Sequence, residues 1–238
     1  NPYVDATVVD ITFVTADGER SPEQLQGFVL PANSVVALSM DVQGARNEPI
    51  LAVSIHASSG RLVAGRLQHY LGQGRLGFSM SLGASAMSTQ WWFSNGEKIS
   101  GNTENLVIYN PSSRDRSLSV VFVNGSDSAN SIEPLLITAP AHRVITIDTG
   151  TIPSLPVGRY GIIVSTNDQD MGDSLGIVVE QVINRRDGNT VGTSVVLGAP
   201  QNSGSTMWSA PSGVTASEDA LQIMNTTSIE ATVSVLQV

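Results

Sequence analysis

Few residues in this chain have types and spacings that could support chemistry, and the most suggestive is a glycine-rich stretch. Residues Gly72–Gly77, GQGRLG, match the dinucleotide-binding pattern G-x-G-x-x-G. That pattern holds a pyrophosphate when it joins a strand to the first turn of a helix, where backbone amides point at the phosphates. Strand-like sequence follows Gly77 here, so we expect a hairpin turn and no dinucleotide site.

The three histidines, His56, His69 and His142, do not form a recognisable catalytic or metal-binding pattern. The sequence has no His-Glu-x-x-His motif of zinc enzymes and no Gly-x-Ser-x-Gly motif of serine hydrolases. It also lacks cysteine, which removes disulfides and thiolate metal sites. We therefore expect no enzymatic activity, no cofactor and no metal ion.

An acidic loop is the clearest polar candidate for binding. Asn167, Asp168, Asp170 and Asp173 lie within seven residues, and their oxygens are of the kind that Ca²⁺ prefers. The spacing does not fit an EF-hand, because Gly172 stands where a fifth-position ligand is needed. We expect a solvated loop without metal, and we retain its four polar residues as candidate contacts to a partner, since recognition loops often extend from rigid strands.

The tryptophans Trp91, Trp92 and Trp208 are the aromatic candidates. Exposed aromatic rings stack on sugars, which would make the chain a glycan-binding module. Aromatic residues near a boundary between repeats more often fill the seam between units, because each ring buries a large apolar area. We favour the seam and keep all three residues as candidate binding residues.

These candidates are set in a repeated strand pattern. The segment Leu106–Val123 joins two apolar runs through a loop that begins with Asn-Pro, and related segments occur at Asn1–Val14 and Leu221–Val238. Matching residues are 109 positions apart in the first part of the repeat and 115 apart later. The difference of six is the acidic loop of residues 167–173, which stands where the first copy has the short turn 58–60. Surface loops tolerate such insertions at little entropic cost.

Apolar residues alternate with polar ones along the repeated segment, and this predicts a strand with one buried face. The expected inward residues are Leu118, Val120 and Phe122 in the second copy, Val9, Ile11 and Phe13 in the first, and Val233 and Val235 in the third.

Short strand-like segments with Gly, Pro and Asn turns continue through the chain, one of them over Ser34–Met40, and no segment has helical periodicity. This pattern predicts an all-β fold of tandem Ig-like β-sandwich units, two near-complete and one partial. We place the units at residues 1–99 (without its first strand), 100–215 and 216–238. We expect the last unit to be a strand pair that packs on the second, and the alternative is that it closes on the first.

Four motifs follow one another from the end of the first unit through the second: Trp92–Gly96 (WFSNG), Glu104–Pro111 (ENLVIYNP), Pro140–Val144 (PAHRV) and Val179–Gln181 (VEQ). Together they resemble the repeated unit of exported bacterial Ig-like sandwiches, in particular an actinobacterial cell-envelope family of unknown function. The resemblance implies an Ig-like fold and an extracytoplasmic location, with a signal or anchor outside this sequence. It implies no catalytic residues.

The charge of the chain limits its partners. The net charge is −9, and Lys98 is the only lysine. An acidic chain without a basic patch is not suited to nucleic acid or to an anionic bilayer, and no apolar run is long enough to span a membrane. We therefore expect a non-enzymatic extracytoplasmic scaffold or protein-interaction module of the cell envelope, with an envelope protein or a glycan as partner. The alternative is a glycan-binding module that uses exposed tryptophans and polar loops.

Overall fold

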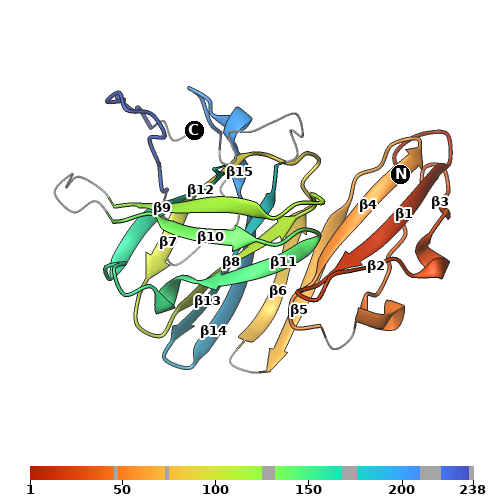
Figure 1. Cartoon of the computed structure of the whole chain (residues 1–238), viewed down its shortest axis with the longest axis horizontal. Coiled ribbons are helices and arrows are strands. Elements are labelled where there is room, and N and C mark those ends of the chain that lie inside the picture. The colour runs from red at the N-terminus through yellow and green to blue at the C-terminus, as the bar shows by residue number, and fades with distance from the viewer. Residues whose placement is uncertain (46–47, 73–74, 125–131, 168–175, 210–220, 236–238) are drawn as a thin grey trace.

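The protein is described from a computed structural model that places residues 1–45, 48–72, 75–124, 132–167, 176–209 and 221–235 (Figure 1). The strands are β1 (Thr7–Val14), β2 (Glu19–Arg20), β3 (Phe28–Leu30), β4 (Ala52–Ser59), β5 (Gly65–Gly72), β6 (Arg75–Leu82), β7 (Gln90–Lys98), β8 (Thr103–Asn110), β9 (Arg116–Val123), β10 (Leu135–Ala139), β11 (Arg143–Asp148), β12 (Gly158–Thr166), β13 (Val178–Asp187), β14 (Thr190–Leu197) and β15 (Ala199–Pro200). The helical turns are η1 (Glu23–Leu25), η2 (Asp41–Ala45), η4 (Thr149–Thr151) and η5 (Gln201–Ser203). The predicted all-β fold is confirmed.

The largest body is a sandwich of two antiparallel sheets (Figure 1). One sheet has the strand order β10-β9-β12-β7-β15, and the other has the order β11-β8-β13-β14. Apolar side chains from both sheets form one core between them, which includes Trp91, Phe93, Leu106, Ile108, Leu118 and Ile162. Within the described residues, no helix is long and apolar enough to cross a membrane.

A smaller sheet is formed by the N-terminal residues, with β1 paired to β2, β3 and β4. The strands β5 and β6 form a separate hairpin in which Gly72 pairs with Arg75, so the glycine-rich stretch joins two strands as predicted, although residues 73 and 74 lie outside the described residues. The boundary expected between residues 99 and 100 does not match the sheets. β7 lies before that boundary, yet it pairs with β12 and β15 of the sandwich.

The predicted alternation of buried residues is confirmed in the first two copies. Leu118, Val120 and Phe122 of β9 point into the sandwich core, and each is less than 5% exposed. The matching residues of β1 are Val9, Ile11 and Phe13, and they are buried to the same extent under the smaller sheet. Burial of such a side chain stabilises a fold by roughly 1.5–3 kcal/mol.

The strand pairing also follows the spacing of 109. Val9 of β1 lies opposite Phe28 and Ala57, and Leu118 of β9 lies opposite Ile137 and Thr166. Leu118, Ile137 and Thr166 each stand 109 positions after Val9, Phe28 and Ala57, in that order. The register of β3-β1-β4 is thus the register of β10-β9-β12, because side chains of the same pattern must reach the same face.

A buried asparagine fixes the loop between β8 and β9. The Asn110 side-chain amide donates to the backbone oxygens of Arg114, Ala139 and Pro140, at 2.9, 2.8 and 3.1 Å. Its oxygen accepts hydrogen bonds from the backbone and the hydroxyl of Ser112. All of its hydrogen-bonding capacity is used, which allows a polar side chain with no exposure to lie inside the fold.

Two other asparagines make parts of the same network. The Asn1 amide donates to the backbone oxygens of Asp5, Leu30 and Pro31, the positions that match the partners of Asn110. The Asn225 amide donates to Ile229 O at 2.7 Å, and its oxygen accepts from Thr227. Asn110 also bonds to Ala139 and Pro140 at the end of another strand. Within the described residues Asn225 makes no corresponding bonds, so its hydrogen bonds stay inside its own loop.

The strand pair expected at the C-terminus is not formed in the described residues 221–235. Leu221 and Ile223 are 62% and 57% exposed, whereas the matching residues of β8, Leu106 and Ile108, are fully buried. The physical reason is that β8 lies between β11 and β13, while residues 221–235 have no paired strand. The segment does cross β12, where a side chain at Gly161 would collide with Met224.

The expected strand over Ser34–Met40 is also absent, for a related reason. Its counterpart, β11, is held by hydrogen bonds to β8. In the smaller sheet no described strand occupies the place of β8, so residues 34–39 have nothing to pair with, and Val35 is almost fully exposed.

Replacing Asn110 by Asp tests the importance of the buried loop. The substitution Asn110→Asp turns a donor that faces three carbonyl oxygens into an acceptor, so unpaired oxygens are forced together without water. We expect the free energy of unfolding to fall by about 3 kcal/mol or more. The matched control is Asn225→Asp, at an exposed copy of the turn, where we expect a loss of about 1 kcal/mol or less. Urea unfolding of both variants checks this, and losses of equal size would contradict it.

Candidate interaction surface

The structure separates the three candidate tryptophans. Trp91 is in the sandwich core, 1% exposed, and its indole nitrogen donates to Ile177 O at 2.7 Å. Trp92, the next residue on β7, points to the opposite face and lies against Gly204 of the segment that follows β15. Trp208 is 69% exposed. Trp91 and Trp92 therefore do not form the sugar-stacking platform of the alternative, and Trp91 fills the interior of one sandwich and not the seam that we favoured.

The acidic loop lies almost entirely outside the described residues. Asp168, Asp170 and Asp173 are not described, and only Asn167 is placed. Its backbone N–H donates to Ser117 O at 2.8 Å, which fixes the end of β12 beside the start of β9, and its side chain is exposed.

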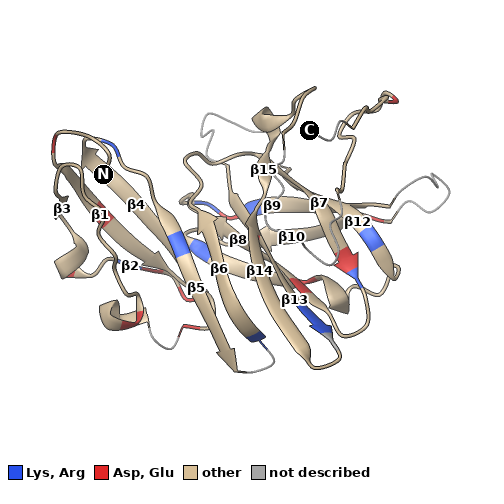
Figure 2. Cartoon of the chain, turned by 180° about the vertical axis from the view of Figure 1, so that it is seen from behind, with Lys and Arg blue, Asp and Glu red and all other residues tan. Residues whose placement is uncertain are grey.

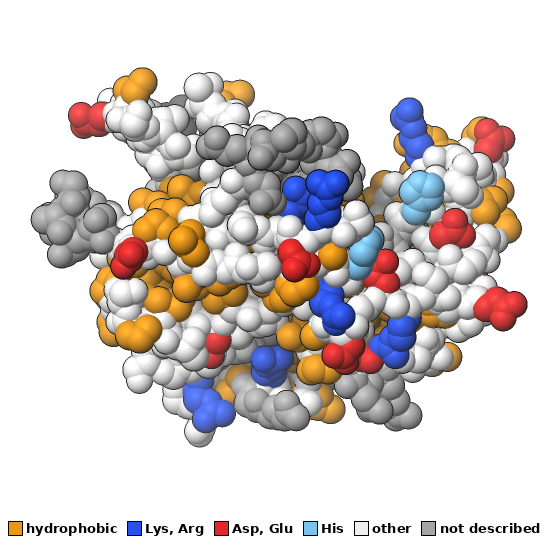
Figure 3. Space-filling view, in the orientation of Figure 1, with side chains coloured by type: hydrophobic (Ala, Val, Ile, Leu, Met, Phe, Trp, Pro, Cys, Tyr) orange, Lys and Arg blue, Asp and Glu red, His pale blue; other side chains and the backbone are white. Residues whose placement is uncertain are grey.

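The seam between the smaller sheet and the sandwich is polar. His142 Nδ1 lies 3.0 Å from Glu19 Oε1, and Val144 N–H donates to Thr15 O at 3.2 Å. Figure 3 shows acidic, basic and histidine side chains gathered along this junction. Beside it, burial and the nearby Glu19 carboxylate raise the pKa of Tyr109. The seam is therefore held by hydrogen bonds and charges, and not by the tryptophans.

The histidines do not come together. His142 has a backbone φ of 51°, and Asn33 at the matching turn has a φ of 48°, so His142 serves a left-handed turn position. His69 stacks on Phe78, and His56 is exposed on β4. Within the described residues, no group of three His, Asp or Glu side chains is placed to hold a metal ion.

One carboxyl group in the sandwich has unusual chemistry that the sequence did not indicate. Glu104 of β8 is 2% exposed and accepts hydrogen bonds from Glu97 N–H at 2.8 Å and from the Tyr160 hydroxyl at 3.2 Å. Burial raises the pKa of Glu104 to about 7, against the opposing effect of these hydrogen bonds. Burial also raises the pKa of Tyr160.

The position of Glu104 favours a structural role. Its two partners belong to β7 and β12 of the facing sheet, so the carboxyl group links the two layers of the sandwich. A general acid must reach its substrate by a direct hydrogen bond or through one water molecule. A side chain closed inside the core in this way cannot reach an external substrate.

Among the described residues, the hairpin β5–β6 gathers six exposed large apolar side chains on two paired strands. One face of it carries Leu67, His69 and Leu71 from β5 and Leu76, Phe78, Met80 and Leu82 from β6, and we call this set the apolar hairpin face. Cross-strand neighbours share a face, and the pairs here are Leu67 with Met80, His69 with Phe78 and Leu71 with Leu76. The six aliphatic and phenyl side chains are 50–78% exposed.

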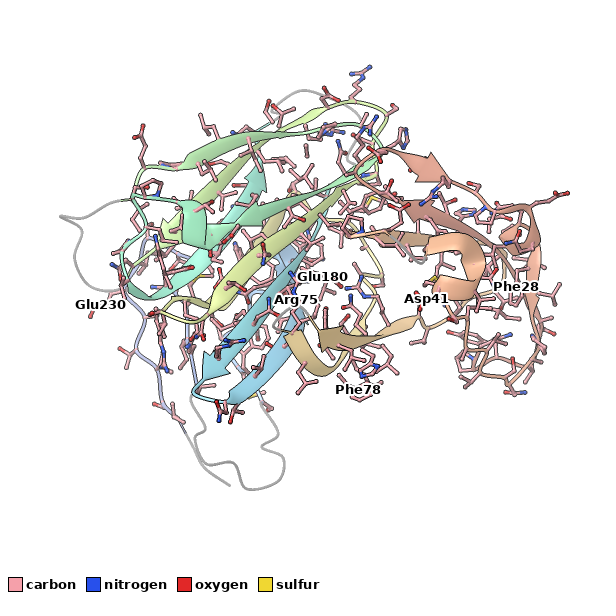
Figure 4. All side chains as sticks on the ribbon, turned by 90° about the horizontal axis from the view of Figure 1, so that it is seen from below. Phe28, Asp41, Arg75, Phe78, Glu180 and Glu230 are labelled. Atoms are coloured by element: carbon pink, nitrogen blue, oxygen red, sulfur yellow. The ribbon has the colours of Figure 1, made fainter. Side chains whose placement is uncertain are left out.

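The centre of this face is an ordered aromatic stack. The rings of His69 and Phe78 lie parallel, with an interplanar angle of 5° and 4.2 Å between their centroids. Figure 4 shows Phe78 at the outer rim of the molecule, pointing away from the sandwich. The two rings therefore stack on each other across the strands, and the face around them is open to solvent.

The opposite face of the hairpin is polar and anchors it to the sandwich. Arg66 forms an ion pair with Glu180 of β13, and Val195 N–H of β14 donates to Ser79 Oγ at 2.9 Å. β5, β6, β14 and β13 follow one another side by side (Figure 2). Burial raises the pKa of Tyr70 on this face, with the charges of Arg66, Arg75 and Glu180 as smaller effects.

The sequence could have indicated this surface. Leu67-x-His69-x-Leu71 and Leu76-x-Phe78-x-Met80 alternate as a strand does. The alternation predicts one apolar face, but it does not tell whether that face is covered, and we normally assume that it is.

The buried carboxyl group predicts a pH dependence of stability. The folded-state pKa of Glu104, about 7, lies above its ordinary 4.5, so the protonated form is favoured by folding. The stability that Glu104 contributes to the fold is fully present below about pH 4.5 and is lost as the pH rises through about 7. The side chain in Glu104→Gln cannot ionise. Between pH 5 and pH 8 we therefore expect the free energy of unfolding of this variant to fall by about 2 kcal/mol less than that of the parent. Urea unfolding at both pH values measures it, with the exposed Glu230→Gln as control. Equal declines in parent and Glu104→Gln would refute the assignment.

Comparisons with known proteins give a family and no activity. The search of functionally curated proteins finds no match. The solved structure of Thermotoga maritima 1070 is 14% identical and covers 48% of this chain and 96% of its own, with a TM-score of 0.38. The Anabaena sensory rhodopsin transducer is 18% identical and covers 45% of this chain and 92% of its own, with a TM-score of 0.34. The sequence profile of one family matches residues 1–237, and the chain therefore belongs to the family of unknown function DUF5719.

Proposed function

We propose that this chain is a non-catalytic protein-interaction module of the cell envelope and that the apolar hairpin face is its contact surface. The observation that carries the proposal is the exposure of six large apolar side chains on one face of β5–β6. Contiguous apolar patches larger than a few hundred Å² are uncommon on soluble monomers and mark binding surfaces.

The energetics support a protein as the partner. Covering each of these partly exposed side chains would contribute roughly 1–2 kcal/mol. The hairpin is held in place from behind by the Arg66–Glu180 ion pair and by the bond from Val195 to Ser79, so little order has to be gained on binding. Leu, Met and Phe side chains on a flat strand surface suit the apolar face of another protein.

The non-catalytic part of the proposal rests on the placement of the titratable groups. Glu104 is closed inside the core, and His56, His69 and His142 lie on different elements. The envelope location rests on the resemblance of the four motifs between Trp92 and Gln181 to exported bacterial sandwiches. An acidic chain with few charged residues is compatible with that location.

The glycan alternative has less support. Of its three tryptophans, Trp208 alone has a freely exposed ring, next to the exposed Met207. Trp91 is in the core, and a single ring is a small platform for a sugar.

Site-specific photo-crosslinking tests the proposal. A benzophenone amino acid replaces Phe78 in one variant and Leu136 in the control, an equally exposed residue of β10. In cells that produce the protein, we expect protein adducts from position 78 and none from position 136. Charged substitutions Leu71→Asp and Leu76→Asp in the same face should abolish the adducts.

Two outcomes contradict the proposal. Absence of adducts at position 78, or equal adducts at both positions, would remove the apolar hairpin face as a contact surface. Retention on envelope polysaccharide that Trp208→Ala abolishes, with Phe78→Asp unchanged, would support the glycan alternative. Protease digestion of intact cells tests the location, since a chain exposed outside the membrane is cleaved and a cytoplasmic one is protected.

A further inference from the structure

We propose that the apolar hairpin face binds the same face of a second copy of this chain, so that two hairpins pack face to face across a twofold axis. This inference rests on the proposed function and names its partner. A twofold interface places one patch against itself, so the patch must be complementary to itself in shape and charge.

The charges of the hairpin meet this requirement. Its two arginines, Arg66 and Arg75, lie in the polar register of the strands, and the apolar hairpin face carries no acidic or basic side chain besides His69. Two copies therefore approach without bringing like charges together.

The shape also suits self-association. The parallel His69–Phe78 stack presents ring edges at the middle of the face, and the flanking pairs Leu67–Met80 and Leu71–Leu76 are similar in size. Sheets pack face to face about 10 Å apart with interdigitating side chains. The stacked ring pair and the aliphatic side chains on both sides of it can interdigitate in this way.

The area available is close to what a stable dimer needs. Six side chains that are 50–78% exposed offer on the order of 100 Å² each, or roughly 600 Å² per copy. Standard protein interfaces bury about 800 Å² per partner. Contacts from the rim of the face would supply the difference, and we expect a dimer of moderate affinity, with a dissociation constant of about 1–10 μM.

Sedimentation equilibrium of the purified chain tests the proposal. We expect a monomer–dimer equilibrium in the parent and at least a tenfold weaker association in Phe78→Asp, because the interface would have to bury a carboxylate. Leu136→Asp is the matched control, at an equally exposed apolar residue outside the face, and should associate as the parent does. Both residues are exposed, so the variants should fold, and circular dichroism and melting temperature check this.

Cross-linking of the purified chain gives a second measurement. The benzophenone at position 78 should form dimer adducts whose cross-linked peptide lies within residues 65–82 of the other copy. A monomer at all concentrations up to about 100 μM, a dimer that Phe78→Asp does not weaken, or adducts to another part of the chain would each overturn the proposal.

The two proposals can fail separately. If position 78 cross-links in cells only to a different protein, the second copy is wrong as partner and the interaction module stands. If position 78 gives no adduct in cells or in the purified chain, both are wrong.

Discussion

Pairing of strands along both edges is the constraint on which this structure depends. An apolar strand leaves water only when neighbouring strands bond its backbone and a facing layer covers its side chains. β8 has both, with β11 on one edge and β13 on the other, and its Leu106 and Ile108 are fully buried. Leu221 and Ile223 have the same pattern without paired neighbours in the described residues, and they remain exposed. One sequence pattern therefore gives a central strand in one place and an extended, exposed segment in another.

The features predicted from the sequence are those that local patterns determine. Alternation identified the buried residues of β1 and β9, because in a strand successive side chains point to opposite faces. The glycines at 72–77 indicated a turn between two strands, and β5 and β6 meet there. The Asn-Pro sequence indicated a loop between two apolar strands, and a loop joins β8 to β9 there. None of these needs knowledge of what lies on the far side of a sheet.

The features that the sequence did not indicate depend on contacts between distant segments. Neighbouring tryptophans on β7 point to opposite faces, and only the sheet that Trp91 packs against decides that its ring is in the core. Glu104 looks like an ordinary polar strand residue, and its raised pKa arises because the facing sheet covers it. β7 belongs to the sandwich because it pairs with β12. Nothing in the composition near residue 99 indicates this pairing. The sequence of a strand thus predicts which of its faces is apolar and where it turns. Tertiary contacts decide which strands it pairs with and what covers its face.

The hairpin β5–β6 lies next to the hairpin β13–β14, and comparing the two explains the exposed face. Asn184 and Thr193 stand 115 residues after His69 and Phe78, are buried, and share a hydrogen bond of 2.7 Å. The polar side of β5–β6 packs against β14, where Ser79 accepts the hydrogen bond from Val195.

A hairpin that ends a stack of layers usually carries polar residues on its outer face, because that face meets water. β5–β6 has the reverse arrangement, with its polar residues toward β14 and its apolar residues outward. Its chemistry is that of an inner layer, and an inner layer requires a further surface to cover it.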